Sequence, residues 1–153
     1  MSVPDDKGRR QAEVAARDPA TDTLARTLYG EARGERVRGK EAVAAVIVNR
    51  VRRAEKRGGY WWGDTIETVC HRPWQFSCWN PSDPNRAKIE AVNPHNRAFA
   101  SCLRIAGRAI GDALADPTGG ATHYHARGCR PPWARGRTPS AEIGNHIFYN
   151  DVE

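Results

Sequence analysis

Residues 22–51 read DTLARTLYGEARGERVRGKEAVAAVIVNRV, and two successive helices are predicted within this segment. In its first half, Leu24 and Leu28 recur at the spacing of one helix face. Asp18-Pro19 and Thr21 precede them as alternative starts, since Asp18 and Thr21 both offer a capping oxygen and Pro19 suits a first helical turn. The pattern predicts a helix that begins there and ends near Gly34, since glycine is typical of helix C-termini.

The second half of the stretch predicts another helix, which begins after Gly39. Its run 42–48 is apolar on nearly every side, so we expect it to be central and buried. The same residues are rich in β-branched side chains, and periodicity alone leaves a buried strand open. Arginines that follow the run favour the helix, because cations complement the negative end of the helix dipole. They lie at positions 50, 52 and 53.

The rest of the chain predicts one more helix and a small sheet. Residues 58–93 hold four of the five tryptophans together with several prolines, which is typical of a long ordered loop. A third helix is expected to begin at Asn93-Pro94 and to end before a glycine-containing turn. Short segments at 121–126 and 143–149 predict two paired strands, separated by a basic loop at 127–140. The predicted fold class is α+β, mostly helical with a small antiparallel sheet.

Length and composition predict one domain. The chain has 153 residues and a mass of 17.0 kDa, enough for a single core. Residues 1–17 are polar and charged without periodicity, so we expect a flexible arm followed by one catalytic domain at 18–153. The longest apolar run is too short to span a bilayer. The N-terminus lacks the apolar region of a secretory signal peptide, so we expect synthesis in the cytoplasm without one.

The charge balance predicts a polyanionic partner. Lys and Arg number 24 and Asp and Glu 18, so the formal net charge is 24 − 18 = +6. Nucleic acid and an anionic cell wall both fit that charge. No zinc-finger spacing or other nucleic-acid-binding motif accompanies it, so no nucleic acid partner is expected. We interpret the arginines between residues 127 and 137 as a solvated basic face.

The four cysteines are too few to define a disulfide scaffold. Cys70 and Cys78 are eight residues apart and could form one bridge in an oxidising compartment. Cys102 lies at an apolar helical position, which predicts an inert core residue.

Glu31 is the most informative polar residue. It follows Leu24 by seven residues, which brings it back to within roughly 20° of that side chain on a helix. Glu31 should therefore point inward, where desolvation and the helix dipole both raise the pKa of a carboxyl group. A general acid that works near neutral pH needs such a pKa. A salt bridge or a backbone hydrogen bond is the alternative, while Glu35 and Glu41 are expected to be solvated surface charges.

The segment 74–80, WQFSCWN, alternates aromatic with amide and hydroxyl side chains. Sugar rings are commonly bound by such a set, with an aromatic face against C–H groups and polar groups on the hydroxyls. The alternative is a hydrophobic plug beneath a long loop.

Two histidines on a predicted strand suggest a metal site. His123 and His125 would point to one face, with His146 or Cys129 as a third ligand for zinc. The alternative, which we favour, is that these histidines make ordinary hydrogen bonds or face a substrate, with no bound metal and no cofactor.

Several of these segments together resemble the bacterial cell wall hydrolase family that includes the spore cortex-lytic enzymes. The similarity extends over about residues 22–150, essentially the whole predicted domain. The segments that carry it are 24–35, 39–51, 75–77, 116–125 and 143–149.

The resemblance implies a lysozyme-like fold and cleavage of peptidoglycan between N-acetylmuramic acid and N-acetylglucosamine. Characterised spore enzymes of the family are lytic transglycosylases, and their catalytic glutamate matches Glu31. The implied partner is the glycan strand, with peripheral contact to the anionic wall by a monomer. The residues expected to bind the glycan are Gln75, Phe76, Ser77, His123 and Tyr124.

The chain also departs from the spore enzymes, since we find no signal peptide and no separate wall-binding domain. A small basic domain of this kind resembles a phage or prophage endolysin released through a holin to the periplasmic or extracellular wall. Three other functions stay open: a hydrolytic muramidase with a second carboxylate, a zinc-dependent wall peptidase, and a non-catalytic wall-binding module. The acids to consider for the muramidase are Asp64, Glu67 and Asp83.

Overall fold

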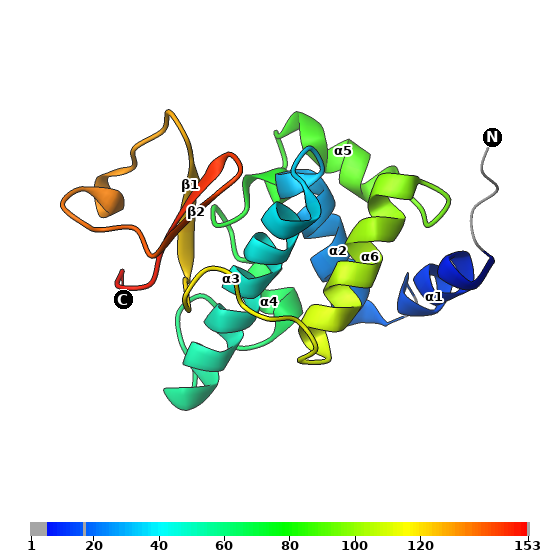
Figure 1. The fold of residues 1–153 in the computed structure, drawn as a ribbon, viewed down its shortest axis with the longest axis horizontal. Coiled ribbons are helices and arrows are strands. Elements are labelled where there is room, and N and C mark those ends of the chain that lie inside the picture. The colour runs from blue at the N-terminus through cyan, green and yellow to red at the C-terminus, as the bar shows by residue number, and fades with distance from the viewer. Residues whose placement is uncertain (1–5, 17, 153) are drawn as a thin grey trace.

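The computed structural model describes residues 6–16 and 18–152. Helix α2 contacts each of the other five α-helices, and a small sheet lies on one side of the helices, at the end of the molecule opposite α1 (Figure 1). The α-helices are α1 (Asp6–Ala16), α2 (Pro19–Ala32), α3 (Val37–Lys56), α4 (Ile66–His71), α5 (Pro84–Ala91) and α6 (Arg97–Ile110). The strands are β1 (His123–Ala126), β2 (Ala141–Ile143) and β3 (His146–Tyr149), and short 3-10 helices span Ser77–Trp79 and Pro132–Ala134.

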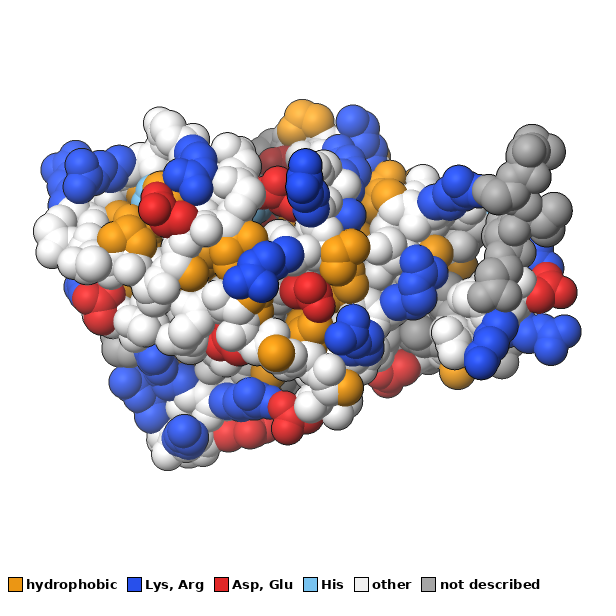
Figure 2. All heavy atoms as spheres, viewed as in Figure 1, with side chains coloured by type: hydrophobic (Ala, Val, Ile, Leu, Met, Phe, Trp, Pro, Cys, Tyr) orange, Lys and Arg blue, Asp and Glu red, His pale blue; other side chains and the backbone are white. Residues whose placement is uncertain are grey.

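Both charge signs are spread over the surface. Figure 2 shows Lys and Arg side chains scattered among Asp and Glu side chains on the visible face. In the basic loop, Arg127 donates to the Gly144 carbonyl at 2.8 Å, and Arg137 donates to the Trp133 carbonyl at 2.8 Å. Arg127, Arg130 and Arg135 are exposed, as expected for a solvated basic face, although Arg127 and Arg137 also bind loop backbone.

The two helices predicted from residues 22–51 are confirmed. Asp18 caps α2 by accepting a hydrogen bond from the Thr21 N–H at 3.2 Å, and Pro19 occupies the first turn. Helix α3 begins at Val37, two residues before Gly39, and the run 42–48 is helical instead of extended. A segment that is apolar on nearly every side suits a helix buried among other helices, which explains why this run is helical and not a strand.

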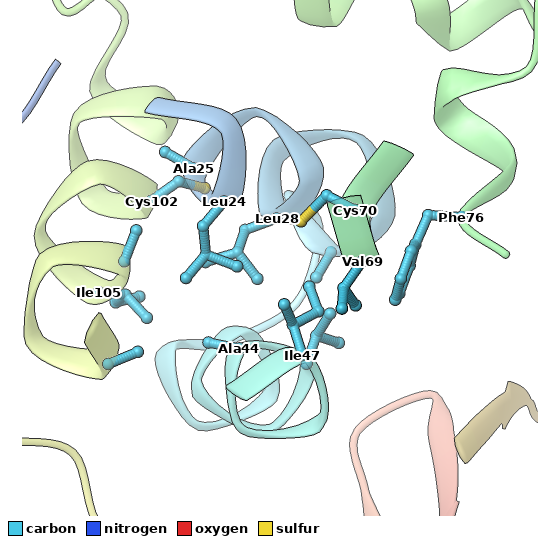
Figure 3. Close-up of a cluster of buried hydrophobic side chains, with 14 of the residues drawn as sticks. Leu24, Ala25, Leu28, Ala44, Ile47, Val69, Cys70, Phe76, Cys102 and Ile105 are labelled. Atoms are coloured by element: carbon cyan, nitrogen blue, oxygen red, sulfur yellow. The ribbon is translucent and has the colours of Figure 1, made fainter. Parts of the chain in front are cut away.

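One hydrophobic core joins these helices (Figure 3). Leu24 and Leu28 of α2 point toward Ile47 of α3, and Val69 of α4 closes the same space. Cys102 of α6 is fully buried there, which confirms it as a core residue, and burial raises the pKa of its thiol to about 11. Cys70 and Cys78 are also buried and are free thiols, so the bridge between them is absent from this structure.

The sheet has the strand order β1-β3-β2, and both pairs are antiparallel. The predicted pairing is confirmed for 123–126 with 146–149, where His123 lies opposite Tyr149, but the predicted strand 143–149 is interrupted by a turn at 144–145 and Ile143 belongs to β2. Strand β2 was not expected, because its first two residues lie between the predicted loop and the predicted last strand, and Ile143 was assigned to that strand. A second, smaller cluster packs the sheet on α3; its buried members are Ala42, Val46, Ala121, Ile143 and Phe148.

The expectation of an irregular loop over residues 58–93 is wrong in part, because α4 and α5 lie within it. Thr65 and Thr68 form a reciprocal capping box that begins α4. Asp83 caps α5. Helices of six and eight residues are too short to establish a periodic pattern, so their caps are the main sequence signal. The third predicted helix begins at Arg97, where Asn96 caps it, and not at Asn93-Pro94.

The flexible arm is also a wrong expectation for residues 6–16, which form α1 and contact α6 and α2. The segment lacks a wide apolar face but is rich in strong helix formers such as Ala, Arg, Gln and Glu. Residues 1–5 and 17 lie outside the described part. Over the described ranges, none of the helices is both long and apolar enough to cross a membrane.

Two glycines give a paired test of this packing. A Cβ at Gly30 in α2 would lie 2.6 Å from Cys78 Cβ, whereas one at Gly107 in α6 would meet nothing within 4 Å. Gly30→Ala should lower the free energy of unfolding by about 1–3 kcal/mol through overpacking. Gly107→Ala should raise it by about 0.5–1 kcal/mol through helix propensity. Urea unfolding with an unchanged m-value measures both, and a stabilised Gly30→Ala would contradict the packing described.

Candidate active site

Glu31 lies in the last turn of α2 and faces a cleft of about 270 Å³ between the helices and the sheet. The walls come from α2, α3, the segment around residue 75, β1 and β3. The lining residues are Glu31, Arg50, Trp74, Gln75, Phe76, Ser77, Tyr124, Ala126 and His146. Among the described residues that line it, Glu31 carries the one carboxyl group.

The surroundings of Glu31 raise the pKa of its carboxyl group to about 7. Burial is the largest cause, and the negative charge of Asp83 adds to it. Hydrogen bonds from the Ser77 backbone N–H and from the Tyr124 hydroxyl oppose the rise, because both stabilise the carboxylate. The inward orientation expected from helix spacing is therefore present, and the raised pKa brings the titration of this carboxyl group close to neutral pH.

Arg50 holds the walls of the cleft together. Its side chain is buried, and its Nε donates to the Thr122 carbonyl at 2.7 Å, at the start of the sheet. Its Nη1 donates to the Gln75 amide oxygen at 3.0 Å. The guanidinium also lies 5.0 Å from the Trp62 ring centre and 5.5 Å from that of Phe76. Sequence reasoning treated Arg50 as a charge at a helix end and missed this role.

Four of the five expected glycan-binding residues lie in the cleft. Ser77 and Tyr124 contact Glu31, and Gln75 contacts Arg50. Phe76 is 2% exposed, so most of its ring packs in the core beneath the cleft. Residues in the 74–80 segment therefore serve both the site and the core.

His123 is the exception, because the structure does not bring it to this cleft. Its Nδ1 lies 2.9 Å from the Thr122 hydroxyl, and its ring contacts Trp62 and Trp133. Successive residues of a strand point to opposite faces, so His123 and its neighbour Tyr124 cannot share one side of the sheet.

The strand register also excludes the alternative zinc set of His123, His125 and His146. His123 and His125 share one face of the sheet with Tyr149, and the His125 Nε2 is 2.9 Å from the Tyr149 hydroxyl. His146 is opposite Ala126 and therefore lies on the other face with Tyr124. The three imidazoles cannot converge on one ion, and no group of three or more metal-binding side chains occurs within residues 6–16 and 18–152.

The expectation that Glu35 and Glu41 are solvated is wrong. The Glu35 side chain is 17% exposed and its Oε1 accepts a hydrogen bond from the Asn145 N–H at 2.8 Å. Glu41 is 21% exposed, and its Oε2 lies 3.8 Å from Arg108. The partners lie on distant segments, so sequence spacing gave no sign of them.

Trp74 stands out on the cleft wall because it is 78% exposed and has a φ of 68°. A non-glycine residue at positive φ is uncommon, and strain of this kind clusters at functional sites. The aromatic segment containing it was noted from sequence, but Trp74 itself was not singled out.

Comparison with known proteins shows to which family the chain belongs. Residues 34–149 match the cell wall hydrolase family, and the matched range begins three residues after Glu31. The chain belongs to the cell wall hydrolases. The expected resemblance is thereby confirmed, whereas a phage origin stays a prediction.

Relatives include two spore cortex-lytic enzymes. That of Halalkalibacterium halodurans is 34% identical over 130 residues, which cover 83% of this chain and 33% of the relative. That of Bacillus subtilis is 30% identical over 151 residues, which cover 93% of this chain and 43% of the relative. The chain thus spans less than half the length of these relatives.

Solved structures similar to the chain confirm the α+β, lysozyme-like fold. The catalytic domain of the germination-specific lytic transglycosylase SleB from Bacillus anthracis has a TM-score of 0.65 and 30% identity. The match covers 84% of this chain and 92% of that domain. The SleB catalytic domain from Bacillus cereus has a TM-score of 0.62, with 30% identity and 88% of that domain covered.

The cause of the raised Glu31 pKa can be tested at Asp83. Asp83→Asn should lower the pKa of Glu31, because the variant removes a like charge but keeps an oxygen that can cap α5. Carboxyl ¹³C chemical shifts followed against pH measure the change. Asp64→Asn, at an exposed position, is the matched control and should leave the Glu31 midpoint unchanged. Equal midpoints in Asp83→Asn and the parent protein would contradict the electrostatic account.

Proposed function

We propose that this domain cleaves peptidoglycan glycan strands between N-acetylmuramic acid and N-acetylglucosamine as a lytic transglycosylase, with Glu31 as the acid and base. The observation that carries the proposal is the single, desolvated carboxyl group of Glu31 in a cleft between helices and sheet. Membership of the cell wall hydrolase family and similarity to SleB, a lytic transglycosylase, support the choice of substrate and reaction.

In the first step, protonated Glu31 donates its proton to the glycosidic oxygen as the bond to the anomeric carbon breaks. A pKa of about 7 leaves a large share of the carboxyl group protonated near neutral pH. The Ser77 N–H and the Tyr124 hydroxyl already contact this carboxyl group. They stabilise the carboxylate that forms, so the leaving alcohol departs without an unpaired buried charge.

In the second step, the Glu31 carboxylate takes the proton of the muramoyl 6-hydroxyl as that oxygen attacks the anomeric carbon. The product carries a 1,6-anhydro ring, no water is consumed, and Glu31 is protonated again. An intramolecular hydroxyl group has a large advantage in effective concentration over free water. One carboxyl group therefore suffices for the whole cycle.

Hydrolytic muramidases usually need a second carboxylate, either to activate water or to act as a nucleophile. Asp83 affects the charge of Glu31, but its side chain accepts a hydrogen bond from the Asn85 N–H at 2.8 Å and is not part of the cleft lining. The lining favours transglycosylation over hydrolysis for this reason.

The cleft wall supplies contacts for the sugar rings. Exposed Trp74 offers an aromatic face, while the polar side chains of Gln75 and Ser77 border the same space. Aromatic faces with a few fixed polar groups are typical of ligand-binding clefts.

Replacing the carboxyl group of Glu31 tests the proposal. Glu31→Gln should keep the fold and lower glycan cleavage by about 10²- to 10⁴-fold, because the amide cannot deliver a proton. Release of soluble muropeptides from purified peptidoglycan measures the activity, and the thermal midpoint checks folding. Glu55→Gln, at an exposed position late in α3, is the control and should cleave normally. A folded Glu31→Gln that retained more than about a tenth of the activity would refute the assignment.

The net charge of +6 supports peripheral contact with an anionic wall. Salt screens such attraction with a Debye length of about 10 Å at 0.1 M. Binding of Glu31→Gln to whole peptidoglycan sacculi should weaken as salt rises, whereas binding to a short neutral chitin oligosaccharide should change much less. Sedimentation assays for the sacculi and calorimetry for the oligosaccharide provide the comparison, and equal salt sensitivity would argue against electrostatic contact with the wall.

A further inference from the structure

Glu35 and the turn before β3 meet beside the cleft, although 110 positions separate Glu35 from Asn145. Glu35 lies in the connection between α2 and α3, and its Oε1 accepts the Asn145 N–H at 2.8 Å. The same oxygen lies 3.3 Å from Nδ1 of His146, the first residue of β3. The reaction scheme above uses neither side chain.

The turn is shaped around the Glu35 carboxylate. Gly144 has a φ of 56°, and a Cβ on it would lie 2.9 Å from Glu35 Oε1. Any larger residue would be strained by its backbone and would also press on the carboxylate. With exposed fractions of 17% for the Glu35 side chain and 10% for the His146 side chain, the pair is largely shielded from water.

The imidazole of His146 lies between the Glu35 carboxylate and the cleft. Nδ1 is buried and without a fully formed hydrogen bond, and the nearby Glu35 carboxylate is the acceptor beside it. The ring lines the cleft and packs edge-to-face on Tyr124, with centroids 4.9 Å apart. A proton on Nδ1, directed toward Glu35, leaves Nε2 as a hydrogen-bond acceptor.

We propose that His146 is a further glycan-binding residue and that Glu35 is a positioning residue, which holds the imidazole so that Nε2 accepts a hydrogen bond from the glycan. The donor is a hydroxyl or N-acetyl N–H group of the strand, because sugars present such donors along the cleft. This inference rests on the proposed function for the identity of the ligand.

The charge state of His146 makes the contact depend on pH. Burial lowers the pKa of the imidazole, Glu35 opposes that shift, and His125 adds to it. The other polar groups in or beside the cleft are the hydroxyl of Tyr124, the carboxyl of Glu31 and the guanidinium of Arg50. Above its lowered pKa the imidazole is neutral, and Nε2 can accept a hydrogen bond from the glycan. Below that pKa both ring nitrogens carry protons, so Nε2 can no longer accept. Glycan affinity should therefore decline as pH falls through this pKa.

The test uses the full chain carrying Glu31→Gln, which separates binding from cleavage, and the disaccharide-repeat tetrasaccharide of peptidoglycan without peptides. Adding His146→Ala should weaken binding by roughly 3- to 10-fold near neutral pH, the effect of one hydrogen bond. The loss of affinity as pH falls through the lowered pKa of His146 should disappear in this variant. Adding Glu35→Gln should shift that loss to lower pH, because the carboxylate that raises the pKa is gone. Glu142→Gln, on the exposed side of the same hairpin, is the control and should change neither the glycan affinity nor its pH dependence.

Long-range ¹H–¹⁵N spectra of the imidazole give a readout that needs no ligand. We expect the tautomer with the proton on Nδ1, and a proton on Nε2 would overturn the proposal. Unchanged glycan affinity and pH dependence in folded His146→Ala would also overturn it, with the proposed function intact. Failure of the Glu31→Gln protein to bind the tetrasaccharide at all would instead contradict both proposals.

Discussion

The hydrogen bonds of the Arg50 guanidinium connect three parts of the molecule that are distant in sequence. From α3, Arg50 reaches the carbonyl of Thr122 before β1 and the amide of Gln75 in the tryptophan-containing segment. A buried cation is costly unless its donors are satisfied, so this arrangement favours one position of the sheet relative to the helices. The groups that contact Glu31, which are Ser77 and Tyr124, come from the two segments held in this way.

The chemistry of Glu31 follows from that geometry. The sheet and the 74–77 segment remove water from the end of α2, and the raised pKa is chiefly the result of this burial. The same segments supply the two donors that stabilise the ionised form. One carboxyl group can then serve as acid and as base in turn, because its environment tolerates both protonation states near neutral pH.

Periodic features of the sequence predicted the parts of the fold that depend on periodicity. The 3.6-residue repeat located α2 and oriented Glu31 inward, and alternation located β1, whereas α3 was predicted from an apolar run followed by arginines. Helices α4 and α5 are too short for such a pattern. His123 could have been excluded as a partner of Tyr124, since neighbours on a strand face opposite ways. The contact of Glu35 with the β3 turn depends on tertiary structure, and spacing along the chain carries no trace of it.

The central claim is that one carboxyl group performs the reaction without adding water. The most direct measurement is a digest of purified peptidoglycan in water labelled with oxygen-18, followed by mass spectrometry of the muropeptides. With the substrate's own hydroxyl as the nucleophile, the new muramic acid ends should carry no label, resist borohydride reduction, and be about 20 Da lighter than ends hydrolysed in the labelled water. Incorporation of one labelled oxygen at each cleaved bond would contradict the account and would require a positioned water and a second group to activate it.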